Sequence, residues 1–308
     1  MITIPQTQLR VYPLCLGGNV FGWSANESES FEVLDAYVAG GGNFIDTADV
    51  YSEWAQGHVG GESETIIGKW MKSRGNRHGL VIATKVSMLS TRPGLSASNI
   101  KGALEDSLRR LQTDHIDLYY SHTDDPNTPL EETLGAYTEE IKAGKIHHIA
   151  ASQYTAPRLR LALETSQQNG FAKYVALQDE YNLMERSPFE TEQRSVLEEF
   201  GISLLPFFGL ARGFLTGKYR PGITVDSVRA EDVQDYQNVK GYKVIETLDE
   251  IAKENSTSIA AVALGWLRAN PAVSAPLASA RSVAQLKEIM QVVTLTPQQV
   301  ALLNSVSQ

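Results

Sequence analysis

The sequence predicts an α/β fold, a (β/α)8 TIM barrel formed as a single domain by residues 1–308, with a short N-terminal extension and a long loop after the seventh strand. Past residue 10, short apolar runs alternate with longer segments of helical period, which is typical of βα units around a parallel sheet. Eight such runs occur. No G-x-G-x-x-G turn follows the first run, as a doubly wound dinucleotide-binding sheet requires.

The eight expected strands are short apolar runs bounded by turn residues. They cover residues 12–17, 43–47, 80–86, 116–121, 146–151, 174–178, 202–207 and 273–277. The segment 217–239 lacks strong periodicity and contains Pro221 and Gly222. In a barrel this segment is a long βα loop rather than a linker between domains.

Several helices carry their own start and stop signals. The letters TPLE at 128–131 indicate a capping box with proline at the first helical position, and the helix ends at Gly144. The letters SPFE at 187–190 repeat the pattern, with Gly201 as the stop. Between residues 100 and 111, apolar residues recur at helical spacing.

Composition and charge exclude several classes of function. The net charge of −9 argues against a protein that binds nucleic acid through the phosphate backbone, and no apolar run is long enough to cross a bilayer. Any anionic ligand must therefore meet a few well-placed lysines or arginines. The N-terminus MITIPQTQLRVYP resembles no secretory or transit signal, and Cys15 alone allows no intrachain disulfide, so we expect a cytoplasmic protein.

Four polar residues lie where the barrel collects its strand ends. Asp46, Lys85 and His122 end three successive predicted strands, and Tyr51 lies in the loop after the first of these. Each alone has a commoner structural role, as a turn acid, a solvated strand end, a core histidine or a loop aromatic. Because the carboxyl ends of barrel strands converge on one face, we expect the four to meet there.

These residue types suit proton transfer to a carbonyl oxygen. A phenol with a pKa near 10 donates poorly at neutral pH unless a nearby cation lowers that pKa. We expect Lys85 to lower the pKa of Tyr51 by ~2 units, which takes ~3 kcal/mol, and Asp46 to keep Lys85 charged. His122 is expected to be a second donor that orients the carbonyl.

Seven segments, in chain order, carry a resemblance to a known family. They read GGNFIDTADVYS, VIATKV, IDLYYSHTDDPNTPLEETL, GKIHHIAASQY, ALQDEYN, LARGFLTGKY and SARSVAQLKE, and together they span about residues 8–290. In these segments the sequence resembles the aldo-keto reductases. The resemblance implies a barrel that binds NADP(H) or NAD(H) in an extended pose and reduces aldehydes or ketones to alcohols. The family's catalytic tetrad falls on Asp46, Tyr51, Lys85 and His122.

The resemblance also implies a set of cofactor-binding positions. They are Gly18, Asn19, Asp46, Ser152, Gln153, Gln178, Phe207, Leu210, Ala211, Arg212, Gly213, Lys218, Ser279, Arg281, Gln285 and Glu288. Gln153 replaces the usual asparagine and keeps its amide, and Phe207 replaces a tyrosine and keeps the stacking ring. The usual Ser-Pro-Leu of the pyrophosphate segment is Phe-Gly-Leu at 208–210, so backbone N–H groups with Arg212 or Lys218 must contact more of the phosphate.

Arg281 indicates the cofactor's identity, because a guanidinium can hold a 2′-phosphate bidentately. We therefore expect NADP(H) to be preferred, with NAD(H) as the alternative. The substrate is expected to be a small-molecule carbonyl compound within an aromatic wall of Phe21, Trp23 and Trp54. Loop packing is an equally good role for the two tryptophans.

The sequence disfavours two other functions and leaves a third open. Adjacent His147 and His148 on one strand point to opposite faces, so no metal site is predicted. A cofactor-free isomerase or glycosidase needs paired carboxylates or metal ligands at the strand ends, where only Asp46 stands. The alternative that stays open is a cofactor-binding regulatory subunit with little turnover. An altered catalytic histidine would favour that function, but His122 is present.

Overall fold

The computed structural model describes residues 1–226 and 229–308, and its centre is a sheet of eight parallel strands. The strands run around the sheet in the order β10-β3-β4-β5-β6-β7-β8-β9. Their bounds are β3 (Cys15–Gly17), β4 (Phe44–Asp46), β5 (Val81–Val86), β6 (Ile116–Ser121), β7 (Ile146–Ser152), β8 (Tyr174–Gln178), β9 (Ser203–Leu204) and β10 (Leu277–Ala278). The predicted (β/α)8 fold and the positions of its eight strands are confirmed.

The sheet closes between β9 and the residues that lead into β10. The Leu204 N–H donates to the Ala272 carbonyl at 2.8 Å, and the Ser274 N–H donates to the Leu204 carbonyl at 3.1 Å. The strands here are shorter than the predicted 202–207 and 273–277. Pro206 and Pro276 explain this difference, because a proline has no N–H to donate to the ladder.

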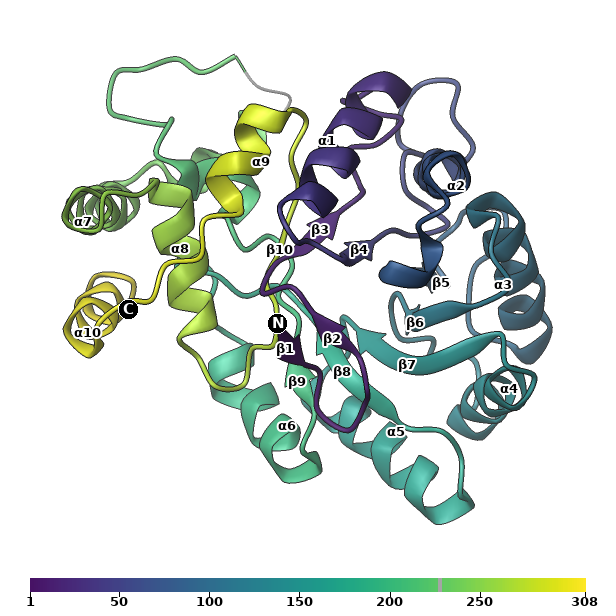
Figure 1. Cartoon of the computed structure of the whole chain (residues 1–308). Coiled ribbons are helices and arrows are strands. Elements are labelled where there is room, and N and C mark those ends of the chain that lie inside the picture. The colour runs from purple at the N-terminus through teal and green to yellow at the C-terminus, as the bar shows by residue number, and fades with distance from the viewer. Residues whose placement is uncertain (227–228) are drawn as a thin grey trace.

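Helices surround the ring of strands on its outer side (Figure 1). They are α1 (Glu27–Ala39), α2 (Glu62–Arg74), α3 (Ala97–Leu111), α4 (Leu130–Lys142), α5 (Ala156–Asn169), α6 (Arg194–Phe200), α7 (Val239–Glu254), α8 (Ile259–Arg268), α9 (Val283–Ile289) and α10 (Pro297–Val306). Short helical turns are η1 (Arg77–Gly79), η2 (Phe189–Gln193), η3 (Ala211–Thr216) and η4 (Glu231–Tyr236). The apolar positions predicted for α3 are buried against its neighbours.

The predicted capping boxes are wrong in detail. Pro129 is itself the N-cap of α4 and no side chain caps that helix, because the Thr128 hydroxyl donates to Asp125 Oδ2 at 2.6 Å instead. The SPFE segment begins the wider turn η2 before α6, without a side-chain cap. Gly201 ends α6 as predicted, in the left-handed conformation with φ of 64° that favours glycine.

The interior of the barrel is filled by apolar side chains, and the N-terminal extension completes this filling. The antiparallel strands β1 (Ile2–Thr3) and β2 (Arg10–Val11) form a small hairpin across one end of the ring (Figure 1). Buried Ile4, Leu9 and Val11 pack in one cluster with barrel residues of β3 to β8. The extension is therefore a plug for the amino-terminal end of the strands, a role that the sequence pattern did not predict.

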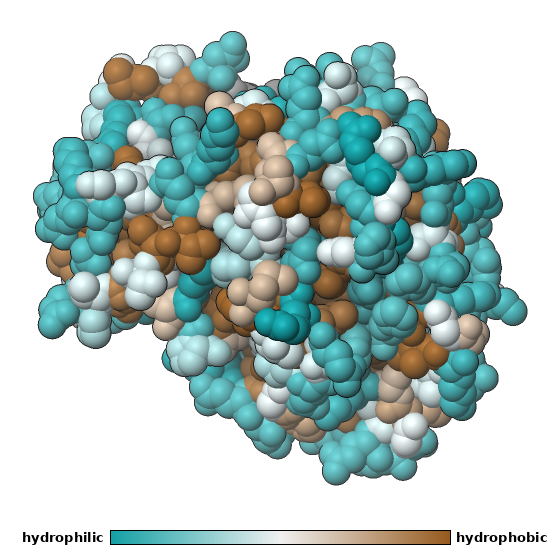
Figure 2. Space-filling model, in the orientation of Figure 1, coloured by the Kyte–Doolittle hydropathy of each residue, from teal (hydrophilic) through white to brown (hydrophobic). Residues whose placement is uncertain are grey.

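The long loop predicted after the seventh barrel strand lies between β9 and α7 and contains η3 and η4. Residues 227–228 of the predicted loop 217–239 lie outside the described residues. In the part of the chain that the structure describes, no helix is long and apolar enough to cross a membrane. On the face in Figure 2, hydrophilic residues predominate and hydrophobic residues form small groups among them.

The contact between α2 and α3 gives a test of the packing. A Cβ added at Gly68 on α2 would lie 2.1 Å from the Arg110 carbonyl oxygen on α3. We expect Gly68→Ala to lower the free energy of unfolding by about 1–3 kcal/mol, because the two helices must separate. Denaturant unfolding measures this change.

Gly135→Ala on α4 is the matched control. Its added Cβ would meet only the Phe171 ring, at 3.8 Å, which is an ordinary van der Waals contact. That variant should be as stable as the parent chain or more stable by roughly 0.5–1 kcal/mol, because alanine is the better helix residue. Equal destabilisation by both substitutions would contradict the close approach of α2 and α3.

Candidate active site

The four residues expected at the strand ends do meet. Asp46 is the last residue of β4, Lys85 is the penultimate residue of β5, and His122 directly follows β6. Tyr51 reaches back from the turn after β4. The parallel register aligns Asp46 with Ala83 and Lys85 with Tyr120, so the ends of the three strands lie side by side.

Lys85 is at the centre of this group. Its side chain is fully buried, and Nζ donates to Asp46 Oδ2 at 2.5 Å, to the Thr47 carbonyl at 2.8 Å and to the Tyr51 hydroxyl at 2.7 Å. Three acceptors match the three hydrogens of an ammonium group. A charge buried this deeply is tolerated only when it is paired and hydrogen-bonded in this way.

The pKa of Tyr51 differs from the sequence-based expectation. Burial is the largest cause, and with the Asp46 carboxylate it raises the pKa of Tyr51 well above 10.0. The expected lowering by Lys85 is not found, because Asp46 offsets the lysine charge and the phenolate would lose its solvation. The Tyr51 hydroxyl therefore keeps its proton at neutral pH and donates it to Asp46 Oδ2 at 3.1 Å.

His122 is neutral in this setting. Burial, followed by the charge of Lys85, lowers the pKa of His122 well below 6.5. The His122 and Tyr51 rings meet edge to face with centroids 5.9 Å apart. Within the described residues, His122 Nδ1 is buried without a hydrogen-bond partner. A neutral imidazole beside the phenol can donate one hydrogen bond to an oxygen held between them.

The next two strands supply amide and hydroxyl groups. Gln178, at the end of β8, donates from Nε2 to Asp46 Oδ1 at 2.9 Å, so both carboxylate oxygens of Asp46 accept hydrogen bonds. Gln153 donates from Nε2 to the His122 carbonyl at 3.0 Å. Ser152 Oγ is buried and finds no partner among the described residues. This hydroxyl is available to a ligand.

These residues line one large cavity of about 870 Å³ at the carboxyl ends of the strands. The volume lies toward the upper end of the usual range of about 300–1,000 Å³ for ligand sites. Most of the expected cofactor residues line it, namely Asn19, Asp46, Ser152, Gln153, Gln178, Phe207, Leu210, Arg212, Gly213, Lys218, Ser279, Arg281, Gln285 and Glu288. Gly18 and Ala211 lie behind the lining and do not face the cavity.

The aromatic wall is only partly as expected. Trp23 and Trp54 line the cavity and pack edge to face, with ring centroids 5.6 Å apart. Phe21 does not reach the cavity, because its side chain is fully buried in the core. Met88 and Phe208 also line the cavity. Phe208 begins the segment expected at the pyrophosphate but was not predicted as a contact, and Met88 belongs to no motif that pointed to it.

Among the residues that the structure describes, four cations line the cavity. They are Arg212, Lys218, Arg229 and Arg281. Arg229 was missed because its loop has no periodicity, and its guanidinium lies 5.7 Å from the Phe208 ring centroid. Arg212 is already paired, with Nη2 3.0 Å from Glu180 Oε2 and Nη1 donating to the Tyr236 hydroxyl.

The segment after β10 lies beside the end of β3. The Ser279 hydroxyl donates to Asn19 Oδ1 at 2.5 Å, and a Cβ on Gly17 would lie 2.5 Å from Ser279 Oγ. Gln285 Oε1 accepts from the Arg281 N–H at 2.9 Å, which fixes the backbone of Arg281. Arg281 lines the cavity from this fixed backbone.

Asp49 is a buried carboxyl beside the site that the sequence analysis did not single out. Both of its oxygens are buried without a hydrogen-bond partner among the described residues. Burial, with the nearby Glu64 carboxylate second, raises the pKa of Asp49 from 3.8 to about 8. Asp49 is therefore largely protonated near neutral pH.

Comparisons with known proteins agree with this geometry. The model of the Aldo/keto reductase family matches residues 13–308. An uncharacterized oxidoreductase, YrpG of Bacillus subtilis, is 33% identical over 301 residues, covering 94% of this chain and 90% of the relative. A probable voltage-gated potassium channel subunit beta of Oryza sativa is 32% identical, with coverage of 94% and 89%. The putative aryl-alcohol dehydrogenase AAD14 of Saccharomyces cerevisiae is 30% identical, with coverage of 97% and 84%.

The raised pKa of Asp49 makes stability depend on pH. Between pH 3.8 and about 8 the folded chain holds a proton on Asp49 that the unfolded chain has lost. The free energy of unfolding therefore falls as pH rises through this window, by up to about 1.4 kcal/mol per pH unit from this group. Asp49→Asn should remove this part of the dependence.

Denaturant unfolding of both proteins at pH 5 and pH 8.5 checks the effect of Asp49. The free energy of unfolding of the variant, minus that of the parent chain, should therefore become more positive between pH 5 and pH 8.5. Two parallel stability curves would show that Asp49 ionises as an ordinary carboxyl does.

Proposed function

The chain belongs to the aldo/keto reductase family, whose members generally use nicotinamide cofactors, and from this premise we propose that it is an NADPH-dependent reductase of aldehydes or ketones. The observation that carries the proposal is the buried pair of Lys85 and Asp46 hydrogen-bonded to Tyr51, which lines the cavity. We further propose a cytoplasmic location, which the single cysteine supports because no intrachain disulfide can form.

The cavity suits a nicotinamide cofactor. The Ser152 hydroxyl, which has no hydrogen-bond partner among the described residues, and the amides of Gln153 and Gln178 are polar groups that could hold a carboxamide. Phe207 offers a ring for stacking. When bound, the cofactor supplies the hydride that the protein's own side chains cannot. Gln178 already holds Asp46, so it would link the cofactor's position to that of the catalytic carboxylate.

Tyr51 is the proton donor in this proposal. Its raised pKa means that the phenol is protonated when substrate arrives, and its proton now points to Asp46 Oδ2. Rotation of the hydroxyl would turn that proton toward a substrate oxygen in the cavity. The phenolate that remains would lie against Lys85 Nζ, 2.7 Å from the oxygen in the present geometry, and this ammonium stabilises the new charge.

His122 would orient the substrate. The neutral imidazole can donate to the carbonyl oxygen from the side opposite Tyr51, which polarises the bond without giving up a proton. A protonated imidazole beside Lys85 would add a second buried positive charge. The lowered pKa of His122 avoids this repulsion.

The cations at the other part of the cavity would bind the cofactor's phosphates. Arg281 suits the 2′-phosphate of NADPH, because it lines the cavity from a backbone fixed by Gln285. Arg212 is held by Glu180 and Tyr236, so it would contribute charge at a fixed position. Lys218 and Arg229 add positive potential to the same cavity.

The substrate is proposed to be an apolar or aromatic carbonyl compound. Trp23, Trp54 and Met88 line the cavity with Tyr51, and the Trp54 ring meets the Tyr51 ring edge to face, with centroids 6.1 Å apart. The name of the yeast relative, an aryl-alcohol dehydrogenase, fits the same class of substrate. Aromatic aldehydes are therefore the first compounds to assay.

Tyr51→Phe tests the proton donor. The variant should lower kcat by about 10²- to 10⁴-fold, because it removes the donated proton and leaves the ring in place. The measurement is NADPH oxidation with a panel of aromatic and aliphatic aldehydes, alongside cofactor binding followed by fluorescence. Binding of NADPH should be unchanged.

Tyr12→Phe is the matched control for loss of a phenol oxygen. Its hydroxyl donates to the Met290 carbonyl, outside the cavity, so the variant should turn over as the parent chain does. A Tyr51→Phe enzyme with parental kcat would remove Tyr51 from the chemistry.

The same assay decides the second candidate, a cofactor-binding regulatory subunit. The rice relative, by its name a channel subunit, is the observation that favours it. That candidate predicts NADPH binding by the parent chain without turnover of any carbonyl compound in the panel. Turnover that depends on Tyr51 would contradict it.

Arg281→Ala tests the cofactor's identity. We expect NADPH affinity to fall by about 10- to 100-fold, the range for losing charged hydrogen bonds, while NADH affinity changes by less than about twofold. Lys287→Ala is the control, because this cation lies on α9, the helix that begins two residues after Arg281, and is not among the residues that line the cavity. Equal losses of NADPH and NADH would exclude Arg281 from binding a 2′-phosphate.

A further inference from the structure

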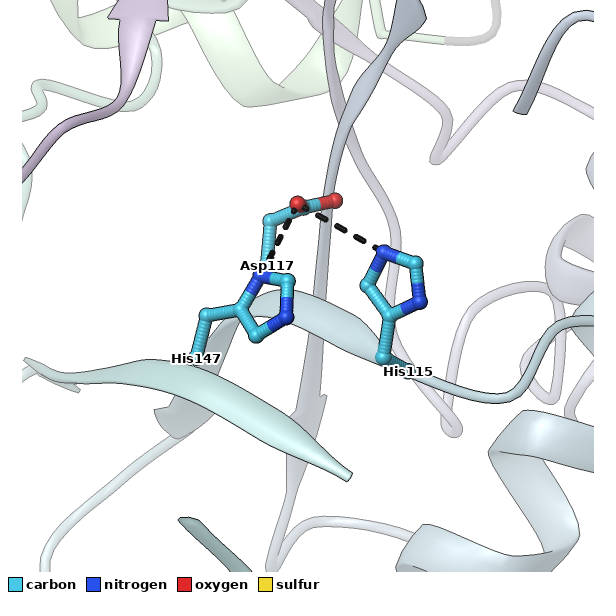
Figure 3. A group of neighbouring side chains, drawn as sticks. All are labelled: His115, Asp117 and His147. Atoms are coloured by element: carbon cyan, nitrogen blue, oxygen red, sulfur yellow. Dashed lines mark ion pairs between the residues drawn. The ribbon is translucent and has the colours of Figure 1, made fainter. Parts of the chain in front are cut away.

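We propose that the chain binds one Zn²⁺ ion between β6 and β7, at the end of the barrel opposite the cavity. The ligands are His115 Nε2, Asp117 Oδ1 and His147 Nδ1, which all lie within 4.8 Å of one another. Figure 3 shows the two imidazole rings turned toward the same carboxylate. Imidazole nitrogen and carboxylate oxygen are the ligands that zinc takes in His₂-carboxylate sites.

The sheet register creates this group. Ile116 pairs with Ile146 and Leu118 pairs with His148, so Asp117 lies opposite His147 on the neighbouring strand. His115 precedes Asp117 by two residues and so shares its face of the sheet. No metal site was predicted from the sequence, because His147 and His148 point to opposite faces and no segment has the spacing of zinc ligands. The ligands proposed here come instead from two segments about 30 residues apart, β7 and the start of β6 with the residue before it.

One of the ligand separations is that of a tetrahedral zinc site, and the group as a whole is wider, with all three atoms within 4.8 Å. Ligand atoms about 2.0–2.2 Å from zinc lie roughly 3.3–3.6 Å apart when the geometry is tetrahedral. The separation of Asp117 Oδ1 from His147 Nδ1 is 3.4 Å, and that from His115 Nε2 is 4.0 Å. The two imidazole rings are stacked, with centroids 4.6 Å apart and an angle of 26° between their planes, so they must rotate for both nitrogens to point at one ion. Both histidine side chains are partly exposed, which leaves room for this rotation and for an ion to enter from solvent.

Two hydrogen bonds fix the Asp117 carboxylate through its Oδ2 oxygen. Asp117 Oδ2 accepts from Arg77 Nη2 at 2.8 Å and from the Ile82 N–H at 2.8 Å. Among the residues that the structure describes, no hydrogen bond reaches Oδ1, the oxygen that faces both rings. A ligand carboxylate fixed by hydrogen bonds through its other oxygen is common in metal sites.

A second carboxylate orients one of the histidines. Asp114 Oδ1 lies 2.6 Å from His115 Nδ1, so the proton of the neutral ring is held on Nδ1. The lone pair of the ring then lies on Nε2, the nitrogen that faces Asp117. This carboxylate-histidine arrangement usually accompanies zinc-binding imidazoles. The two carboxylates, Asp114 and Asp117, lie beside the group together with the Arg77 guanidinium, which pairs with Asp117.

The ion would bind only the folded chain, because the three ligands come together only when β6 and β7 pair. Zinc should therefore raise the melting temperature of the protein. The fourth coordination position would be taken by water. The proposal does not rest on the proposed reductase activity, and its readouts are binding and stability.

Calorimetric titration of Zn²⁺ into the metal-stripped, full-length protein tests the site. We expect one ion per chain and a higher melting temperature at saturating zinc. His147→Gln should abolish the binding, and Asp114→Ala should weaken it by about 10-fold or more, since it removes the group that orients His115. NADPH binding at the other end of the barrel should be unchanged in both variants.

His148→Gln is the matched control, because this neighbouring histidine lies on the opposite face of β7 and pairs with Leu118. Its zinc affinity should equal that of the parent chain. The proposal is overturned if the parent chain binds no zinc, if His147→Gln binds as the parent does, or if His148→Gln loses as much affinity as His147→Gln.

Discussion

The buried contact between Lys85 and Asp46 is the interaction on which the site depends. Both side chains are essentially excluded from solvent, with exposed fractions of 0% and 1%. Removing either partner would leave an unpaired charge in the barrel, which costs several kcal/mol. The fold meets this requirement because parallel register brings the ends of β4 and β5 together, while the turn after β4 returns the Thr47 carbonyl and the Tyr51 hydroxyl to the same nitrogen.

This ion pair also affects the protonation state of the Tyr51 phenol. A lone lysine beside Tyr51 would favour the phenolate and lower its pKa. Because Asp46 offsets the lysine charge, burial is the larger effect, and it raises the pKa of Tyr51. Tyr51 therefore keeps its phenolic proton in the free protein. Charge stabilisation by Lys85 becomes important only as the proton leaves, when negative charge develops on the phenol oxygen. Stabilisation that is stronger in the transition state than in the ground state is the kind that accelerates a reaction.

The sequence was sufficient for features that depend on local pattern and on the order of the strands. The eight strands, the meeting of Asp46, Lys85 and His122, and the helix from 100 to 111 all follow from alternation, helical period and strand ends. Features that depend on long-range packing were missed. The burial of Phe21 is set by packing in the core, and the plug formed by Ile4 and its neighbours requires knowledge of which barrel end the chain covers.

The two ends of the barrel have different roles. The carboxyl ends of the strands carry the buried charges of Asp46 and Lys85, and the cavity opens there. The amino ends are closed by the hairpin of β1 and β2 and by ion pairs such as Arg77 with Asp117. An ion held at these amino ends by His115 and His147 would join β6 to β7, and β6 is the strand that His122 directly follows. Because the ligands lie at the opposite end of β6, such an ion would stabilise the scaffold of the site without entering its chemistry.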